Sequence, residues 1–260
     1  MSTIVVIDLE CTSREPAEAH IVEWAAIVIR PPWFGEGGAE EHGGLVRPPI
    51  AIPPETSAVH HIVDADVADA PTWLKECERL FNLLAGEEGV IAVAHNAEYE
   101  RTVLVGNNQM PEIQGLHWLC TYKAALRVWP DAPGHSNECL RYFLGFGTGR
   151  RGQQAPHSAL HDAKVTAQIL DELLRLGTSL EDMLRWTNEP ALLPTCPLGD
   201  WRGRKWSDVD EGFLLWIMRK IHDRADVRFC ANTELERREA ERAKARPAPV
   251  TADDEDEVPF

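Results

Sequence analysis

Two acidic residues, Asp8 and Glu10, end the first apolar segment of the chain. Alternate side chains of a β-strand point to the same face, so both carboxylates would lie side by side at the end of a strand predicted over residues 3–9. Like charges beside an apolar strand are unfavourable unless a cation lies between them. The same D-x-E spacing recurs at Asp253 and Glu255, in an acidic segment without such a strand. The position of the pair therefore carries the prediction, and the spacing alone does not.

Two later segments each supply one more carboxylate. Glu100 follows the apolar run 90–94, within the letters AHNAEYE, and Asp162 falls in the first turns of a helix predicted over residues 159–176. Hydrolysis of a phosphodiester needs a nucleophilic water and a way to neutralise the negative charge on the scissile phosphate, and two divalent cations about 4 Å apart supply both. Because magnesium prefers oxygen ligands, the four carboxylates form a candidate metal site. Glu98, at the same helix start as Glu100, is better explained by the favourable interaction of acids with a helix dipole.

A histidine precedes the last of these acids by five residues. His157, in the letters HSALHD, could take a proton from an attacking water held by the metals. An isolated histidine is more often structural, so the ordered set of three segments carries the prediction. The preceding segment 145–156, GFGTGRRGQQAP, holds four glycines and two adjacent arginines. We interpret it as a mobile lid that carries His157, rather than as a plain surface loop.

The remaining pattern predicts an α/β fold. Strands over residues 3–9 and 21–30 and a short one near 44–46 would form an antiparallel meander. Apolar residues at helical spacing predict a helix over residues 71–84. The run 90–94 is typical of a buried strand. Ser158 is a plausible N-cap for the helix over 159–176, which Gly177 would end.

The ordered set resembles the DEDD exonuclease superfamily in its histidine subclass, since the tyrosine subclass would have tyrosine at the position of Ser158. The likeness spans about residues 3–220 and is strongest in a few segments: IVEWAAIVI (21–29), LVRPPIAIPPETSAVHHI (45–62), AHNAEYERTVL (94–104), WLCTYKAALRVWP (118–130), HSALHDA (157–163) and LGDWRGRKWSDV (198–209). The resemblance implies a ribonuclease H-like domain, with a mixed central sheet flanked by helices. It also implies metal-dependent 3′–5′ exonuclease activity.

By that resemblance, Asp8, Glu10 and Asp162 would hold one Mg²⁺, and Asp8 would share a second with Glu100. Mn²⁺ could substitute, and His157 would be the general base. The family has aspartate where this chain has Glu100, whose extra methylene could reach the metal directly or displace its waters. This departure could lower the activity or shift the metal preference toward manganese. Five further residues are candidates for contact with the substrate: Arg14, His60, Asn96, Arg150 and Arg151.

The chain divides by composition into four predicted parts. These are an exonuclease domain over residues 1–177, a linker over 178–193, a small C-terminal module over 194–236, and a charged, disordered tail over 237–260. Within the module, tryptophans alternate with cations, as they do on nucleic-acid-binding surfaces. Tryptophans at this spacing also occur in cores, and both interpretations stay open. The residues concerned are Trp201, Arg202, Arg204, Lys205 and Trp206.

The bulk properties limit the class of protein. A net charge of −16 argues against tight, indiscriminate binding of duplexes, although a carboxylate cluster that holds cations is compatible with it. The six cysteines form no C-x-x-C pair, which argues against structural zinc and for a reducing compartment. With no apolar run long enough to span a bilayer, we expect a cytoplasmic protein without a membrane partner.

The predicted partner is a single-stranded or 3′-ended nucleic acid, with DNA favoured. An RNA-trimming exonuclease is the first alternative, because the contacts that recognise a 2′-hydroxyl cannot be located from the sequence. A catalytically weakened module that only binds nucleic acid or protein is the second, supported by Glu100 alone. The sequence indicates no particular protein partner.

Overall fold

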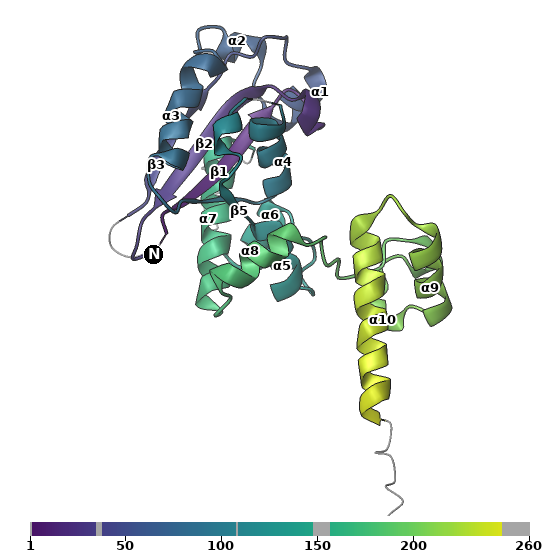
Figure 1. Ribbon diagram of the computed structural model, residues 1–260. Helices are drawn as coiled ribbons and strands as arrows, with labels where there is room; N and C mark the ends of the chain where they lie inside the picture. Colours follow the sequence, from purple (N-terminus) through teal and green to yellow (C-terminus); the bar gives the residue numbers. More distant parts are fainter. Residues whose placement is uncertain (1, 35–37, 108, 148–156, 246–260) are drawn as a thin grey trace, which may run out of the picture. The chain divides into compact units, whose positions relative to one another are not determined.

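The computed structural model describes residues 2–34, 38–107, 109–147 and 157–245, and the chain forms two compact units, Met1–Pro190 and Ala191–Phe260 (Figure 1). The predicted linker over 178–193 is wrong for most of its length. It contains helix α8, Leu180–Asn188, in which Met183 is fully buried. The Thr187 hydroxyl accepts the backbone N–H of Cys120 at 2.8 Å, which ties α8 to the sheet. This helix therefore belongs to the first unit.

The first unit is built on a mixed sheet of five strands in the order β3-β2-β1-β4-β5. Strands β1, β2 and β3 form the antiparallel meander predicted from the sequence, with β3 longer than expected, and β4 and β5 run parallel to β1. This confirms the predicted α/β class with a mixed central sheet. The strands are β1 Ile4–Cys11, β2 Ile21–Ile29, β3 Glu40–Leu45, β4 Ile91–Ala94 and β5 His117–Cys120.

Helices cover both faces of the sheet, and the alternation along β1 decides which residues meet which helix (Figure 1). Odd-numbered residues such as Ile7 pack in a core with helix α3, Trp73–Ala85. Even-numbered residues such as Ile4 pack in a second core with helix α7, Ala159–Arg175. Asp8 and Glu10 continue the even series, so their side chains lie on the α7 face of the sheet.

Helix α7 has a cap at its start and a glycine just past its end, and several other helices of the first unit are short. Ser158 caps α7, as predicted, because its hydroxyl accepts the backbone N–H of His161 at 3.4 Å. Past the end of α7, Gly177 adopts a φ of +86°, a conformation that glycine reaches without steric cost. The short helices are α1 Pro54–His60, α2 Asp64–Val67, α4 Ala97–Arg101, α5 Thr121–Val128 and α6 Asn137–Phe143.

The second unit contains helices α9, Glu211–Lys220, and α10, Ala225–Ala245, around a small core of its own. The disordered tail predicted from residue 237 begins too early, because residues 237–245 continue α10. Arg237 pairs with Glu234 at 2.7 Å and with Glu241 at 2.5 Å, spacings of three and four residues that stabilise a helix. The rest of the predicted tail, 246–260, lies outside the described residues. No helix in the described part of the chain is long and apolar enough to cross a membrane.

Packing of α7 against the sheet fixes the position of its first turn, so it can be tested through a core leucine. Leu170 is fully buried in the α7 face of the core. We expect Leu170→Ala to lower the free energy of unfolding by about 2–5 kcal/mol, through lost burial and the cavity left behind. Urea unfolding followed by circular dichroism measures this. Leu176→Ala is the control, since Leu176 is 55% exposed just past the same helix, and equal losses in both variants would contradict the assignment of the core.

Candidate active site

Three of the predicted carboxylates meet at one point. An oxygen from each of Asp8, Glu10 and Asp162 lies within 4.8 Å of the other two. Strand β1 supplies the first two from its even-numbered face, and the first turn of α7 supplies the third. Residues more than 150 positions apart in sequence therefore present oxygen ligands to a common point, which is what binding of a hard divalent cation requires.

A fourth predicted carboxylate, Glu100, is buried beside these three. Its side chain is only 5% exposed, and its Oε2 has no hydrogen-bond partner among the described residues. Burial raises the pKa of Glu100 to about 8. The neighbouring Tyr99 hydroxyl donates to the Ser13 carbonyl at 2.6 Å, which fastens α4 to the turn after β1. A buried carboxylate oxygen without a donor is costly unless a cation satisfies it, so Glu100 fits a metal-binding role.

The pKa shifts show that these acids interact with one another. Burial is the largest cause of the rise in the pKa of Asp8 and Glu10, and the charges of Glu100 and Asp162 raise both further. The pKa of Glu10 rises to about 8. Burial also raises the pKa of Asp162, while the charges of His161 and His157 oppose that rise. Oxygen donors with this much uncompensated negative charge fit divalent cations.

His157 lies near this cluster but outside its buried part. Its side chain is exposed, and its backbone has a φ of +63° directly before the cap of α7. The charge of His157 lowers the pKa of both Asp162 and His60, so the imidazole is within electrostatic reach of the carboxylates. An exposed imidazole next to buried acids can exchange a proton with bulk water. The predicted lid falls mostly on residues 148–156, which lie outside the described residues.

A pocket of about 310 Å³ opens beside the carboxylates. Glu10 and Glu100 line it together with Arg14, His60 and Asn96, three of the five predicted substrate contacts. The His60 Nδ1 accepts a backbone N–H at 3.1 Å, and its Nε2, buried, has no partner in the described part of the chain. The other two predicted contacts lie outside the described residues: Arg150 and Arg151.

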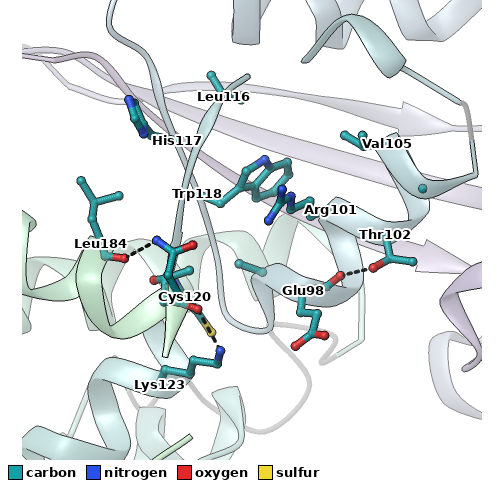
Figure 2. A pocket seen from close by; sticks show the side chains of 14 residues that line it. Glu98, Arg101, Thr102, Val105, Leu116, His117, Trp118, Cys120, Lys123 and Leu184 are labelled. Atoms are coloured by element: carbon teal, nitrogen blue, oxygen red, sulfur yellow. Dashed lines mark hydrogen bonds between the residues drawn. The ribbon is translucent and has the colours of Figure 1, made fainter. Parts of the chain in front are cut away.

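A larger pocket of about 590 Å³ lies on the other side of α4, against β5 and α8 (Figure 2). Glu98, Arg101, Trp118 and Lys123 line it, and none of the predicted catalytic residues does. The Lys123 amine donates to two backbone carbonyls, at 2.8 Å and 2.7 Å, so this cation serves to hold α8 in place. Volume therefore does not locate the chemistry, whereas the convergence of acids does.

A comparison with known proteins shows the family to which the chain belongs. The family model RNase_T, described as an exonuclease, matches residues 5–170. The chain belongs to this exonuclease family. The matched region contains all five predicted catalytic residues and ends before the second unit. The resemblance to DEDD exonucleases of the histidine subclass is thereby confirmed, and with it the class of enzyme, a hydrolase of phosphodiester bonds.

Individual relatives of the exonuclease support the same family. The chain is 36% identical over 186 residues to Exodeoxyribonuclease 10 of Escherichia coli (strain K12), and the match covers 68% of this chain and 76% of that protein. A DNA polymerase III subunit epsilon-like protein of Rhodobacter capsulatus is 34% identical over 179 residues, covering 66% of this chain and 24% of the relative. Among solved structures, exonuclease X in complex with 5′ overhanging duplex DNA is 31% identical, with a TM-score of 0.55, covering 71% of this chain and 99% of that one.

One acid of the exonuclease site was not predicted from the sequence. Glu23 on β2 lies directly opposite Glu10 in the strand register. Its Oε2 accepts the backbone N–H of Ala159 at 2.8 Å, so it holds the first residue of α7 against the sheet. Burial raises the pKa of Glu23, and its charge contributes to the raised pKa of Asp8 and Glu10. The signal in the sequence is an acid inside the apolar letters IVEWAAIVI.

A second unpredicted group holds α7 from its other side. Glu138 on α6 accepts hydrogen bonds from the His161 ring at 2.7 Å and from the Arg141 guanidinium at 2.9 Å and 3.0 Å. Glu138, His161 and Asp162 also have the spacing of a metal site. The bonds from Arg141 and His161 already neutralise Glu138, so we assign these residues to positioning. Arg141 also donates to the Gly147 carbonyl at 3.2 Å, at the start of the segment that leads to His157.

The raised pKa values predict how the stability of the metal-free exonuclease depends on pH. Unfolding returns Glu10 and Glu100 from a pKa of about 8 to their ordinary value of 4.5. Between these values the folded protein binds more protons than the unfolded one, so its free energy of unfolding falls as the pH rises through this window. Above the window, the stability that the protonated forms of these two acids contributed is lost. We expect the free energy of unfolding in EDTA to decrease between about pH 5 and pH 8.

The variant Glu100→Gln should flatten this pH dependence, and Glu98→Gln should leave it unchanged because Glu98 is exposed on the same helix. Adding Mg²⁺ at the high end of the window should restore stability, since a ligand that binds only the folded state stabilises it. Urea unfolding at a series of pH values measures both effects. Identical slopes in Glu100→Gln and the parent would contradict the buried, uncompensated state of Glu100.

Proposed function

We propose that the protein is a 3′–5′ exonuclease that removes nucleotides from the 3′ ends of DNA with two Mg²⁺ ions, for which Mn²⁺ can substitute. The observation that carries the proposal is the convergence of the Asp8, Glu10 and Asp162 oxygens within 4.8 Å, next to Glu100, whose buried Oε2 has no hydrogen-bond partner among the described residues. Asp8, Glu10 and Asp162 would hold one ion, and Asp8 and Glu100 the second. When bound, the ions supply an activated water and stabilise the leaving oxygen.

The protein's own groups would do the rest. His157 would act as the general base, taking the proton of the attacking water at an imidazole nitrogen and passing it to solvent, to which its side chain is open. Glu23 and Glu138 would keep α7, and with it Asp162, at a fixed position relative to β1. The pocket lined by Arg14, His60 and Asn96 would receive the terminal nucleotide.

DNA is the proposed polymer because of the relatives. Exodeoxyribonuclease 10 is named for a deoxyribonucleic substrate, and exonuclease X was solved with duplex DNA. A single-stranded or frayed end would suit a pocket of about 310 Å³ better than a closed duplex, because the terminal nucleotide must leave its stack to enter it. Glu100 in place of the aspartate of the family leaves the ligand chemistry the same, since both are carboxylates.

The direct test is release of mononucleotides from labelled single-stranded DNA in Mg²⁺ or Mn²⁺. We expect release from a free 3′ end, none from a blocked 3′ end, and slower release from RNA of matched sequence. Asp8→Ala should abolish it, because Asp8 would contact both ions. Equal release by the parent and by Asp8→Ala would place the chemistry elsewhere, and release from RNA faster than from DNA would favour an RNA-trimming enzyme.

The role of His157 is tested by His157→Ala. Loss of a general base should lower kcat by about 10²–10⁴-fold. Binding of Mn²⁺, measured by isothermal titration calorimetry, should remain, because the carboxylates are intact. His61→Ala is a matched control, since His61 is also exposed and also has a φ of +63°. A variant His157→Ala with the parent's kcat would remove His157 from the mechanism.

A further inference from the structure

Three aromatic rings form a row on the second unit. Trp201, from the 3₁₀ turn Gly199–Trp201, lies 6.4 Å from Phe213 between ring centroids, and Phe213 stacks on Trp216 at 5.3 Å with an interplanar angle of 15°. Trp216 is 44% exposed, so the last ring of the row is open to solvent. Trp206, by contrast, is buried and donates its indole N–H to the Leu193 carbonyl at 2.8 Å. The sequence could not separate these two roles.

Exposed cations flank this row at both ends. Arg202 follows Trp201 directly, in a turn closed by the bond from the Arg204 N–H to the Trp201 carbonyl at 3.0 Å. Arg219 and Lys220 come three and four residues after Trp216 on α9, which places them on the same side of the helix. Within the described residues, no acid pairs with Arg202, Arg219 or Lys220.

Stacked rings beside unpaired cations match the chemistry of unpaired nucleic-acid bases and their phosphates. Each base offers a flat face to an aromatic ring, and each phosphate a negative charge to a guanidinium or amine. A closed duplex does not offer its base faces to a ring, because its bases are already stacked on one another. The chain carries a net charge of −16, so an acidic protein would be repelled by it as a whole. The strand being degraded is the polyanion that the proposed function already brings to the molecule.

We propose that the exposed ring of Trp216, backed by Phe213 and Trp201 and flanked by Arg202 and Arg219, forms a platform on which an unpaired base of the substrate strand stacks. This inference rests on the proposed function, since it names a second contact for the same strand. The two units are joined covalently, so a strand held by the platform stays at a raised effective concentration near the exonuclease unit. The platform would therefore strengthen binding of long strands and leave short oligonucleotides unaffected.

The test uses the full chain carrying Asp8→Ala, in EDTA, so that no cleavage occurs. Fluorescence anisotropy of a labelled oligo-dT measures its affinity. Adding Trp216→Ala should weaken binding about 5-fold or more, and Trp216→Phe should restore most of it, because the loss of one stacked base is an effect of that size. Leu215→Ala is the matched control, because Leu215 directly precedes Trp216 on α9 and is 38% exposed but carries no ring. Circular dichroism checks that each variant is folded.

Salt dependence supplies a second readout. Arg202→Ala with Arg219→Ala should reduce the slope of log affinity against log salt by about 1.4, at about 0.7 per phosphate contact for single strands. An unchanged affinity in Trp216→Ala, or an equal loss in Leu215→Ala, would overturn the platform. In the chain with Asp8 intact, failure to release nucleotides with either metal would instead overturn the proposed function, so the two failures are distinguishable.

Discussion

The crowding of carboxylates at one end of a buried strand is the constraint that the rest of the fold must withstand. Asp8, Glu10, Glu23, Glu100 and Asp162 all have a raised pKa, and for each of them burial is the largest cause. Like charges in such a place repel one another and lose their hydration, so the arrangement persists only because other parts of the fold hold it. A cation between these acids would turn the unfavourable interaction into a favourable one. The site is thus built for an ion at the expense of the stability of the metal-free protein.

The apolar layers on either side of β1 supply the opposing stability. Ile4 and Val6 on one face and Val5 and Ile7 on the other are fully buried, so β1 cannot slide without exposing both cores. Helix α7 is fastened at its first turn from two directions. Glu23 on β2 accepts the first backbone N–H of α7, and Glu138 on α6 accepts a hydrogen bond from the ring of His161 on α7. Asp162 therefore reaches the cluster as part of a rigid frame.

Local patterns predicted the parts of the site that depend on local geometry. The alternation along β1 places Asp8 and Glu10 together, and the cap at Ser158 places Asp162 in the first turn of α7. Glu23 escaped prediction because an acid in an antiparallel strand is usually a solvated position. Only the pairing with Glu10 and the approach of α7 show that it is half-enclosed. Those contacts are tertiary, and no spacing within the strand encodes them.

The same limit explains the C-terminal half. The segment of α8 is short and polar enough to suggest a linker, and its membership of the first unit is decided by the burial of Met183 and by the hydrogen bond that the Cys120 N–H of β5 donates to Thr187. Trp206 lies among polar residues in the sequence and Trp216 among apolar ones, yet Trp206 enters the core and Trp216 faces solvent. Trp206, which precedes α9, packs with Val227 and Cys230 of α10, whereas α9 turns Leu214 and Ile217 to that core and leaves Trp216 outside it.

An acidic exonuclease with a nucleic-acid substrate is physically consistent once short-range and long-range forces are separated. A net charge of −16 weakens the general attraction for polyanions, which acts over about a Debye length and does not distinguish ends from interiors. In the proposed function, contacts that act only at close range would carry the recognition, namely ions held by the carboxylates, the pocket beside them, and ring faces such as that of Trp216. An enzyme that must advance by one nucleotide after each hydrolysis gains from this division, because a strand held by few ion pairs along its length can move without breaking many of them.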